Sequence, residues 1–277
     1  MHTSSAPVWT ASTLSEALSL RDAHPEATVL AGGTDLMVYV ESGSMTLEGV
    51  LNLWGCADLG GIEQTSEGVR IGAMSTWRDV RASTLMPDAL RECAATVGAA
   101  QIQNRGTVGG NIVNGSPAGD SLPLWLALDA QFEVASVDGS RRIAASEFWT
   151  GYRQNAMSAN ELLVAVHIAP VDGDMLHFRK VGTRMAQAIS KVVLGGRVRR
   201  ENGQIVEARV ALGSVAATPI RLPSVESALV AGAGIEASAH VSQDITPIDD
   251  IRSTSDYRMS VAKRIVRSWI GQCLKQP

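Results

Sequence analysis

Glycine, asparagine and aspartate gather in residues 105–120, which read RGTVGGNIVNGSPAGD. Glycines in such a run let a ligand approach the backbone closely, so that N–H groups can face anionic oxygens. Asn111, Asn114 and Asp120 add amide and carboxylate groups suited to ribose and ribityl hydroxyls. The composition therefore predicts a site for an anionic, hydroxyl-rich ligand. A plain glycine-rich turn between two core elements is the alternative.

A second glycine pair, in residues 28–36 (TVLAGGTDL), favours the binding interpretation. Residues 28–31 predict a short buried strand that ends at the glycines, and Thr34 and Asp35 suit the start of a helix over 36–42. A glycine turn that leads into a helix N-terminus is a ready phosphate site, through free N–H groups and the helix dipole. The stretch matches neither a Walker A loop nor GxGxxG. One dinucleotide pyrophosphate could instead be held by two glycine loops from separate segments.

The two stretches, in this order, resemble the FAD-binding subunit of molybdenum-containing hydroxylases. That family includes the medium subunits of carbon monoxide dehydrogenase and of bacterial xanthine dehydrogenase-like enzymes. AGGTDL at 31–36 and RGTVGGNIVNGSPAGD at 105–120 carry the resemblance. FRKVGTR at 178–184 and DIRSTSDYRMSVAKRIV at 250–266 are similar to signatures of the family's third domain. The likeness therefore runs through most of the chain.

The resemblance implies an α+β fold in two parts. A PCMH-type, two-subdomain FAD-binding region would span residues 1–170, with subdomains of about 1–55 and 56–170. A small α+β C-terminal domain, a three-stranded antiparallel sheet with helices, would span 171–277. The sequence agrees with this division, because Pro170 and the polar residues after it are typical of a linker.

Hydrophobic periodicity predicts the elements that position the two glycine stretches. Strands and helices follow in an order typical of an α+β domain and not of a doubly wound sheet. Predicted helices cover 13–23, 36–42, 77–83, 87–97, 122–128, 224–230 and 258–274, and predicted strands cover 28–31, 50–54, 69–72, 131–137, 141–143, 161–168, 175–181, 189–199 and 204–214.

The resemblance also implies which residues contact FAD. The first loop would consist of Ala31, Gly32, Gly33, Thr34, Asp35 and Leu36. The second loop would be lined by Thr107, Gly110, Asn111, Val113, Asn114 and Asp120. Leu163 would lie on the strand near the flavin ring, and Lys180 near the ring's polar edge. Neither loop offers His, Cys or Tyr for attachment, so we expect non-covalent FAD.

The sequence departs from the family pattern at two places. Relatives often read SPAADLAP where residues 116–123 have Gly119, which loosens the turn but keeps Asp120. A position that is often acidic in relatives is Ala188 here, which leaves the contacts of the 184–191 loop open.

Composition excludes several other classes of protein. With 277 residues, 45% hydrophobic and 19% charged, the chain suits two or three small globular domains. Its net charge of −4 argues against a nucleic-acid binder. No apolar run reaches the roughly 18–20 residues of a membrane span, and the N-terminus lacks a signal-peptide pattern, so we expect a cytoplasmic protein. The three cysteines lack CxxC spacing and cannot supply four thiolates to an ordinary iron–sulfur cluster.

The expected function is therefore that of an electron-transfer flavoprotein subunit of a multi-subunit molybdenum hydroxylase. The resemblance implies a small iron–sulfur partner with [2Fe–2S] clusters, a large partner with the molybdenum cofactor, and a dimer of heterotrimers. No residue is assigned a catalytic or metal-binding role in this chain. The alternatives are a non-redox nucleotide-binding regulatory or scaffold module, and a stand-alone flavin reductase, for which no substrate acid or base is identifiable.

Overall fold

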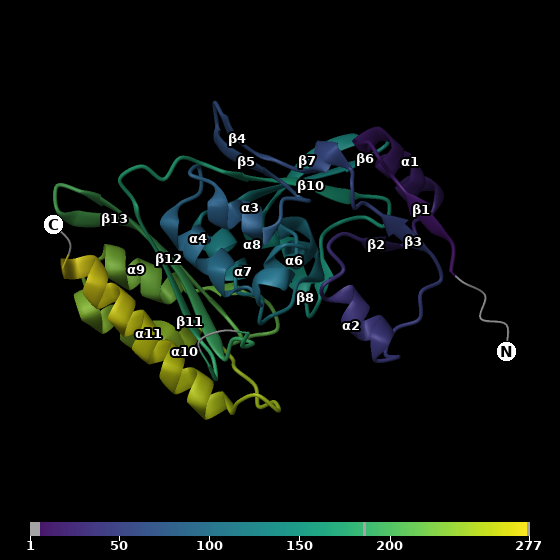
Figure 1. Cartoon of the computed structure of the whole chain (residues 1–277). Coiled ribbons are helices and arrows are strands. Elements are labelled where there is room, and N and C mark those ends of the chain that lie inside the picture. Colours follow the sequence, from purple (N-terminus) through teal and green to yellow (C-terminus); the bar gives the residue numbers. More distant parts are fainter. Residues whose placement is uncertain (1–5, 185–186, 276–277) are drawn as a thin grey trace.

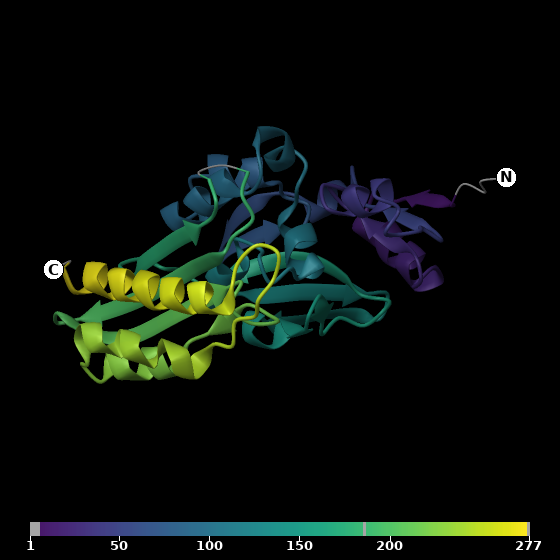
Figure 2. The same ribbon diagram turned by 90° about the horizontal axis from the view of Figure 1, so that it is seen from below.

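The computed structural model describes residues 6–184 and 187–275, which form three regions in chain order (Figure 1). The N-terminal region and the last helix lie at opposite ends of the molecule, as the view from below also shows (Figure 2). No helix in the described part of the chain is long and apolar enough to cross a bilayer.

The N-terminal region is a small parallel sheet with two helices. Its strands pair in the order β1-β3-β2. Helix α1 begins after Thr13, whose hydroxyl accepts a hydrogen bond from the Glu16 backbone N–H. All three residues of β2 are only half-buried, because β2 is an edge strand, so the prediction of a buried strand was wrong. The elements are β1 (Val8–Thr10), α1 (Leu14–Ala23), β2 (Thr28–Leu30), α2 (Leu36–Glu41) and β3 (Val50–Asn52).

The middle region is a five-stranded antiparallel sheet in the order β4-β5-β10-β6-β7. Central strand β10 is buried on both faces, which explains its continuous apolar run. One face packs against helices of the same region, and the other against α1 and β3. The strands are β4 (Ile62–Thr65), β5 (Gly68–Gly72), β6 (Gln131–Ser136), β7 (Gly139–Ala144) and β10 (Leu162–Ile168).

Short helices cover the sheet of the middle region. Pro123 lies in the first turn of α7, as the sequence predicts, and every residue of α7 is buried. The predictions did not include α5, α6, the first strand of the chain, β4, or the small hairpin β8–β9. The helices are α3 (Trp77–Ala82), α4 (Asp88–Thr96), α5 (Ala100–Gln103), α6 (Val108–Asn114), α7 (Leu122–Ala127) and α8 (Ala145–Phe148), with η1 (Ala57–Leu59), β8 (Trp149–Gly151) and β9 (Gln154–Asn155) beside them.

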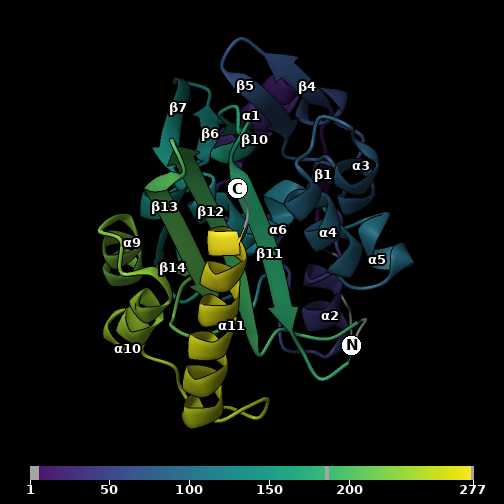
Figure 3. The same ribbon diagram turned by 90° about the vertical axis from the view of Figure 1, so that its left-hand side faces the viewer.

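The C-terminal region is an antiparallel sheet in the order β11-β12-β13-β14, with α11 lying across it (Figure 3). The three predicted strands are present, but a fourth, two-residue strand joins them. Two glycines of β12 allow close packing on both faces. A Cβ at Gly195 would lie 2.7 Å from the backbone of Leu124 in α7, and one at Gly196 would lie 2.5 Å from the Trp269 ring of α11. The elements are β11 (Met175–Val181), β12 (Val192–Glu201), β13 (Gln204–Gly213), β14 (Ile220–Arg221), α9 (Pro223–Val230), η2 (Gly234–His240), α10 (Val241–Asp244) and α11 (Ser255–Lys275).

Candidate functional site

The two glycine stretches, far apart in sequence, pack against each other. A Cβ at Gly32 would lie 1.8 Å from the carbonyl oxygen of Arg105, so only glycine fits there. A Cβ at Gly106 would lie 3.3 Å from the Thr34 hydroxyl oxygen, and one at Gly110 would lie 3.8 Å from the Cβ of Ala31. The expectation that separate segments share one location is therefore met by the fold. We call 31–36 the first glycine segment and 105–114 the second.

The first glycine segment leaves a row of backbone donors unused. No described residue accepts a hydrogen bond from the N–H groups of residues 31–35. Gly33 has φ +75°, a left-handed conformation that glycine adopts without strain. Thr34 and Asp35 lie at the start of α2 as predicted, with Asp35 at the N-cap, but the Asp35 side chain makes no capping bond. Its carboxylate lies 3.5 Å from Arg153 Nη1 instead.

Most backbone donors at the start of the second glycine segment are in use. The N–H groups of Val108 and Gly109 donate to Ser75 O (2.9 Å) and Ala73 O (2.8 Å). Thr107 caps α6 by accepting a hydrogen bond from the Gly110 N–H at 3.1 Å. The prediction of a loop with free N–H groups was therefore wrong for residues 108–110, because the stretch folds into helix α6.

The polar side chains of α6 face two different neighbours. Asn111 Oδ1 accepts a hydrogen bond from Ser121 Oγ at 2.7 Å. Asn114 Oδ1 accepts one from Arg153 Nη1 at 2.6 Å. Val113 is half-buried at the edge of the core between the five-stranded sheet and its helices. Nothing in the sequence pattern singled out Arg153, which lies in the tight turn between β8 and β9.

Asp120 and Lys180 form a buried ion pair where the middle region meets the C-terminal sheet. Lys180 Nζ lies 2.5 Å from one Asp120 oxygen and also donates to Thr96 O at 3.1 Å. Ser190 Oγ donates to the other Asp120 oxygen. Burial raises the pKa of the Asp120 carboxyl, and the Lys180 ammonium and these hydrogen bonds limit the rise. Both carboxylate oxygens are thus engaged within the chain.

Leu163 is one of the buried predicted contacts, together with Thr107 and Asp120. It is on β10 with 6% of its surface exposed, in the core that the sheet shares with α6 and α7. Helix α6 packs on β10 and is linked to it through Ala73, whose N–H donates to Val164 O at 2.8 Å. In the 184–191 loop, residues 185–186 lie outside the described residues.

Comparison with known proteins matches the two halves of the chain to two related domains. The FAD binding domain of molybdopterin dehydrogenases matches residues 3–171, and the CO dehydrogenase flavoprotein C-terminal domain matches residues 177–273. The chain belongs to this family of flavoprotein subunits.

Individual relatives extend the likeness over nearly the whole chain. The xanthine dehydrogenase FAD-binding subunit of Escherichia coli is 30% identical, over 95% of this chain and 94% of the relative. The carbon monoxide dehydrogenase medium chain of Afipia carboxidovorans is 30% identical over 87% of each chain. The solved carbon monoxide dehydrogenase of Hydrogenophaga pseudoflava superimposes with a TM-score of 0.91 at 26% identity, covering 97% of this chain and 96% of that one.

The chain contains the FAD-binding domain of this family, and the junction of its glycine segments offers groups of the kind that FAD requires. The unbonded N–H groups of residues 31–35 are the donors that a pyrophosphate requires, and only glycine at position 32 permits the junction. Among the described residues, no group of three or more His, Cys, Asp and Glu side chains could hold a metal ion. Burial raises the pKa of Cys273 to about 12, so this thiol is protonated near neutral pH.

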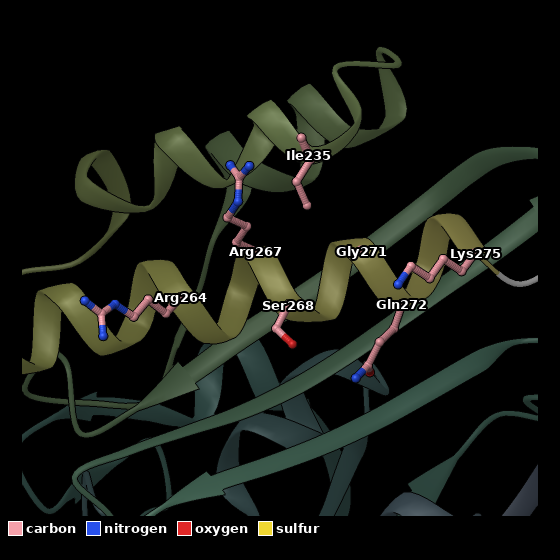
Figure 4. Close-up of a pocket in the computed structure, with 7 residues that line it drawn as sticks. All are labelled: Ile235, Arg264, Arg267, Ser268, Gly271, Gln272 and Lys275. Carbon is pink, nitrogen blue, oxygen red and sulfur yellow. The ribbon is translucent and has the colours of Figure 1, made fainter.

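Two surface hollows of the flavoprotein lie away from the glycine segments. The first runs along the outer face of α11 and under η2 (Figure 4), and the second lies between α4, β11 and α11. Neither contains a predicted FAD contact. The first is lined by Ile235, Arg264, Arg267, Ser268, Gly271, Gln272 and Lys275.

Proposed function

We propose that this chain is the electron-transfer subunit of a multi-subunit molybdenum hydroxylase. It receives electrons from a small iron–sulfur subunit and passes them to an external acceptor. A third, large subunit carries the molybdenum cofactor and oxidises the substrate. The proposal includes a cytoplasmic location and a dimer of heterotrimers. Family membership supports the flavoprotein role, and relatives named as medium chains and FAD subunits support the multi-subunit assembly.

The junction of the two glycine segments is the observation that carries the proposal. Gly32 abuts Arg105, which brings a row of unbonded N–H groups beside α6. A dinucleotide needs such donors for its pyrophosphate and polar side chains for its hydroxyls. The chain supplies these donors and polar side chains from two segments that lie far apart in sequence, with α3, α4 and α5 between them.

We assign the following roles to the residues of the site. The N–H groups of residues 31–35 bind the pyrophosphate, and the Asn111 and Asn114 amides orient the sugar and ribityl hydroxyls. The Asp120–Lys180 pair fixes the polar edge of the site against the C-terminal sheet. When bound, FAD supplies the ability to accept and release electrons, and the protein supplies placement and electrostatics.

Expression with and without the neighbouring subunits tests this function. The chain alone should bind FAD and hydroxylate nothing, and the co-expressed complex should contain iron, molybdenum and flavin in fixed ratio. Substrate should bleach the flavin absorbance only in the complex. Flavin that stays oxidised when substrate is added to the complex would favour a non-redox nucleotide module. Substrate turnover by the metal-free chain would favour a stand-alone reductase.

The same preparation tests how FAD is attached. Because neither glycine segment contains His, Cys or Tyr, acid precipitation should release all the yellow colour into the supernatant. Colour that stays with the pellet, together with a mass increase on one peptide, would show a covalent link.

A further inference from the structure

The hairpin β8–β9 closes the C-terminal end of α6. Trp149 Nε1 donates to Ile112 O at 3.0 Å, and Asn155 Nδ2 donates to Val113 O at 3.4 Å. These carbonyls belong to the last turn of α6, where a helix lacks its own donors. The hairpin therefore has a fixed position relative to the second glycine segment.

Arg153, at the tip of this hairpin, reaches from α6 to α2. Its Nη1 donates to Asn114 Oδ1 at 2.6 Å and lies 3.5 Å from Asp35 Oδ2. Its Nη2 donates to the Tyr39 hydroxyl oxygen at 2.5 Å. Figure 1 shows β8 close to both α6 and α2. One planar guanidinium thus joins the helix that follows the first glycine segment to the helix within the second.

The backbone of Arg153 is in a conformation that its side chain makes unfavourable. Its φ is +53°, in the left-handed region, which favours glycine or asparagine in a turn of this kind. Strained residues of this type persist where the surrounding structure holds them, and they cluster at binding sites. With the backbone in this conformation, the Arg153 guanidinium lies between the two glycine segments.

Helix α2 has little else to hold it. None of its residues is buried, and Met37 and Val38 are 50% and 62% exposed. A helix of six residues is not stable by itself in water. Helix α2 is therefore attached to the middle region by the contacts of Arg153 with Asp35 and Tyr39, and not by packing in the core.

We propose that Arg153 is a positioning residue for FAD: it holds α2, and with it the free N–H groups of residues 31–35, at a fixed place relative to α6. This inference rests on the proposed function, since the ligand it serves is FAD. Arg153 acts through Asp35, Tyr39 and Asn114 and is not itself a ligand of the pyrophosphate.

Arg153→Gly is the most informative variant, because glycine accepts the positive φ and removes only the side chain. Thermal stability should be kept, while amide hydrogen exchange over residues 36–41 becomes faster in the FAD-free chain. The dissociation constant of FAD should rise on the order of tenfold or more. Arg142→Gln is the matched control: it breaks an ion pair with Glu67 in the turn between β4 and β5, away from the hairpin and from both glycine segments, and should change neither the exchange over residues 36–41 nor the dissociation constant of FAD.

A double-variant cycle separates positioning from direct contact. If Arg153 acts through Tyr39, then adding Tyr39→Phe to Arg153→Gln should weaken FAD binding no further than Arg153→Gln alone. Fully additive losses would show that the guanidinium acts independently of the Tyr39 hydroxyl, and would overturn positioning through that contact. Arg153→Lys should recover only part of the affinity, because an ammonium cannot span two partners as the fork does.

The outcomes distinguish this inference from the proposed function. If the parent chain binds no FAD, the proposed function fails, yet the exchange experiment on the FAD-free chain still reports whether Arg153 holds α2. If exchange over residues 36–41 is unchanged in both Arg153→Gly and Arg153→Gln, the inference is wrong even when FAD binds normally.

Discussion

The two glycine segments meet at one place but differ in what their backbones do. In the first, residues 31–36 are half-buried or exposed, and a run of N–H groups has no partner among the described residues. In the second, residues 106–109 are buried, and the Gly106 carbonyl and the N–H groups of Val108 and Gly109 pair with residues 73–77. The same glycine-rich composition therefore leaves free N–H donors in one segment and forms a packed support in the other.

The difference shows that glycine has two separate uses in this site. A Cβ at Gly109 would lie 2.7 Å from the Cβ of Ala73, so this glycine permits close packing of α6 on the turn that follows β5. Gly33, at φ +75°, permits a turn that leaves donors facing outward. A glycine-rich motif thus indicates that something lies close to its backbone. Whether that neighbour is a ligand or another segment of the chain depends on the fold.

Gly32→Ala should produce the largest effect, because it removes the contact between the two segments. The added Cβ would lie 1.8 Å from Arg105 O, which is a backbone atom and cannot move aside cheaply. We expect FAD binding to be lost and the free energy of unfolding to fall by about 4 kcal/mol or more. Equilibrium denaturation and flavin fluorescence measure the two quantities.

Gly60→Ala is the control for that prediction. Gly60 has extended backbone, and a Cβ there makes an ordinary contact of 3.4 Å. Unchanged FAD binding in Gly32→Ala would mean that the junction of the two segments is not the site.

Asp120→Ala should lower the stability of the chain more than it lowers the affinity for FAD. The substitution leaves the Lys180 ammonium buried without its partner, which costs about 3–5 kcal/mol in the free energy of unfolding. Adding Lys180→Met removes the stranded charge and should restore most of the loss. If Asp120→Ala unfolded as the parent does but lost FAD, the carboxylate would be a ligand group and not a support.

Thr107→Ala should have a smaller effect, confined to the supporting segment. It removes the side chain that accepts the Gly110 N–H at the start of α6, a capping bond worth about 0.5–2 kcal/mol. We expect lower stability with little change in FAD affinity, and Thr107→Ser should behave as the parent. A large loss of FAD without a loss of stability would place the Thr107 hydroxyl against the ligand.

The sequence predicted most of the fold because its longer elements have clear periodicity and capping. The strands at Leu162–Ile168 and Met175–Val181 and the helix Ser255–Lys275 follow the predicted ranges closely. Elements of two to four residues, such as β8 and β9, were missed because so short a run has no periodicity. Their position depends on the α6 carbonyls that they contact.

The sequence suggested that the two glycine segments hold one dinucleotide together, and the family resemblance supported that prediction. It could not predict which segment would keep free N–H groups, since that depends on the pairing of residues 73–77 with 106–109. Arg153 was missed for the same reason. Its partners Asp35, Tyr39 and Asn114 lie far from it in sequence, and no local pattern marks a turn residue as a bridge.

The mildest test changes nothing in the chain and compares the two segments directly. Without FAD, the N–H groups of residues 31–35 should exchange with solvent rapidly, because they are not hydrogen-bonded, whereas those of Val108 and Gly109 should be protected by Ala73 and Ser75. Adding FAD should slow exchange over 31–35 and leave 108–109 nearly unchanged. Riboflavin, which lacks the pyrophosphate, is the control and should not protect the first segment. If FAD instead protected only the second segment, the assignment of binding surface and support would be reversed.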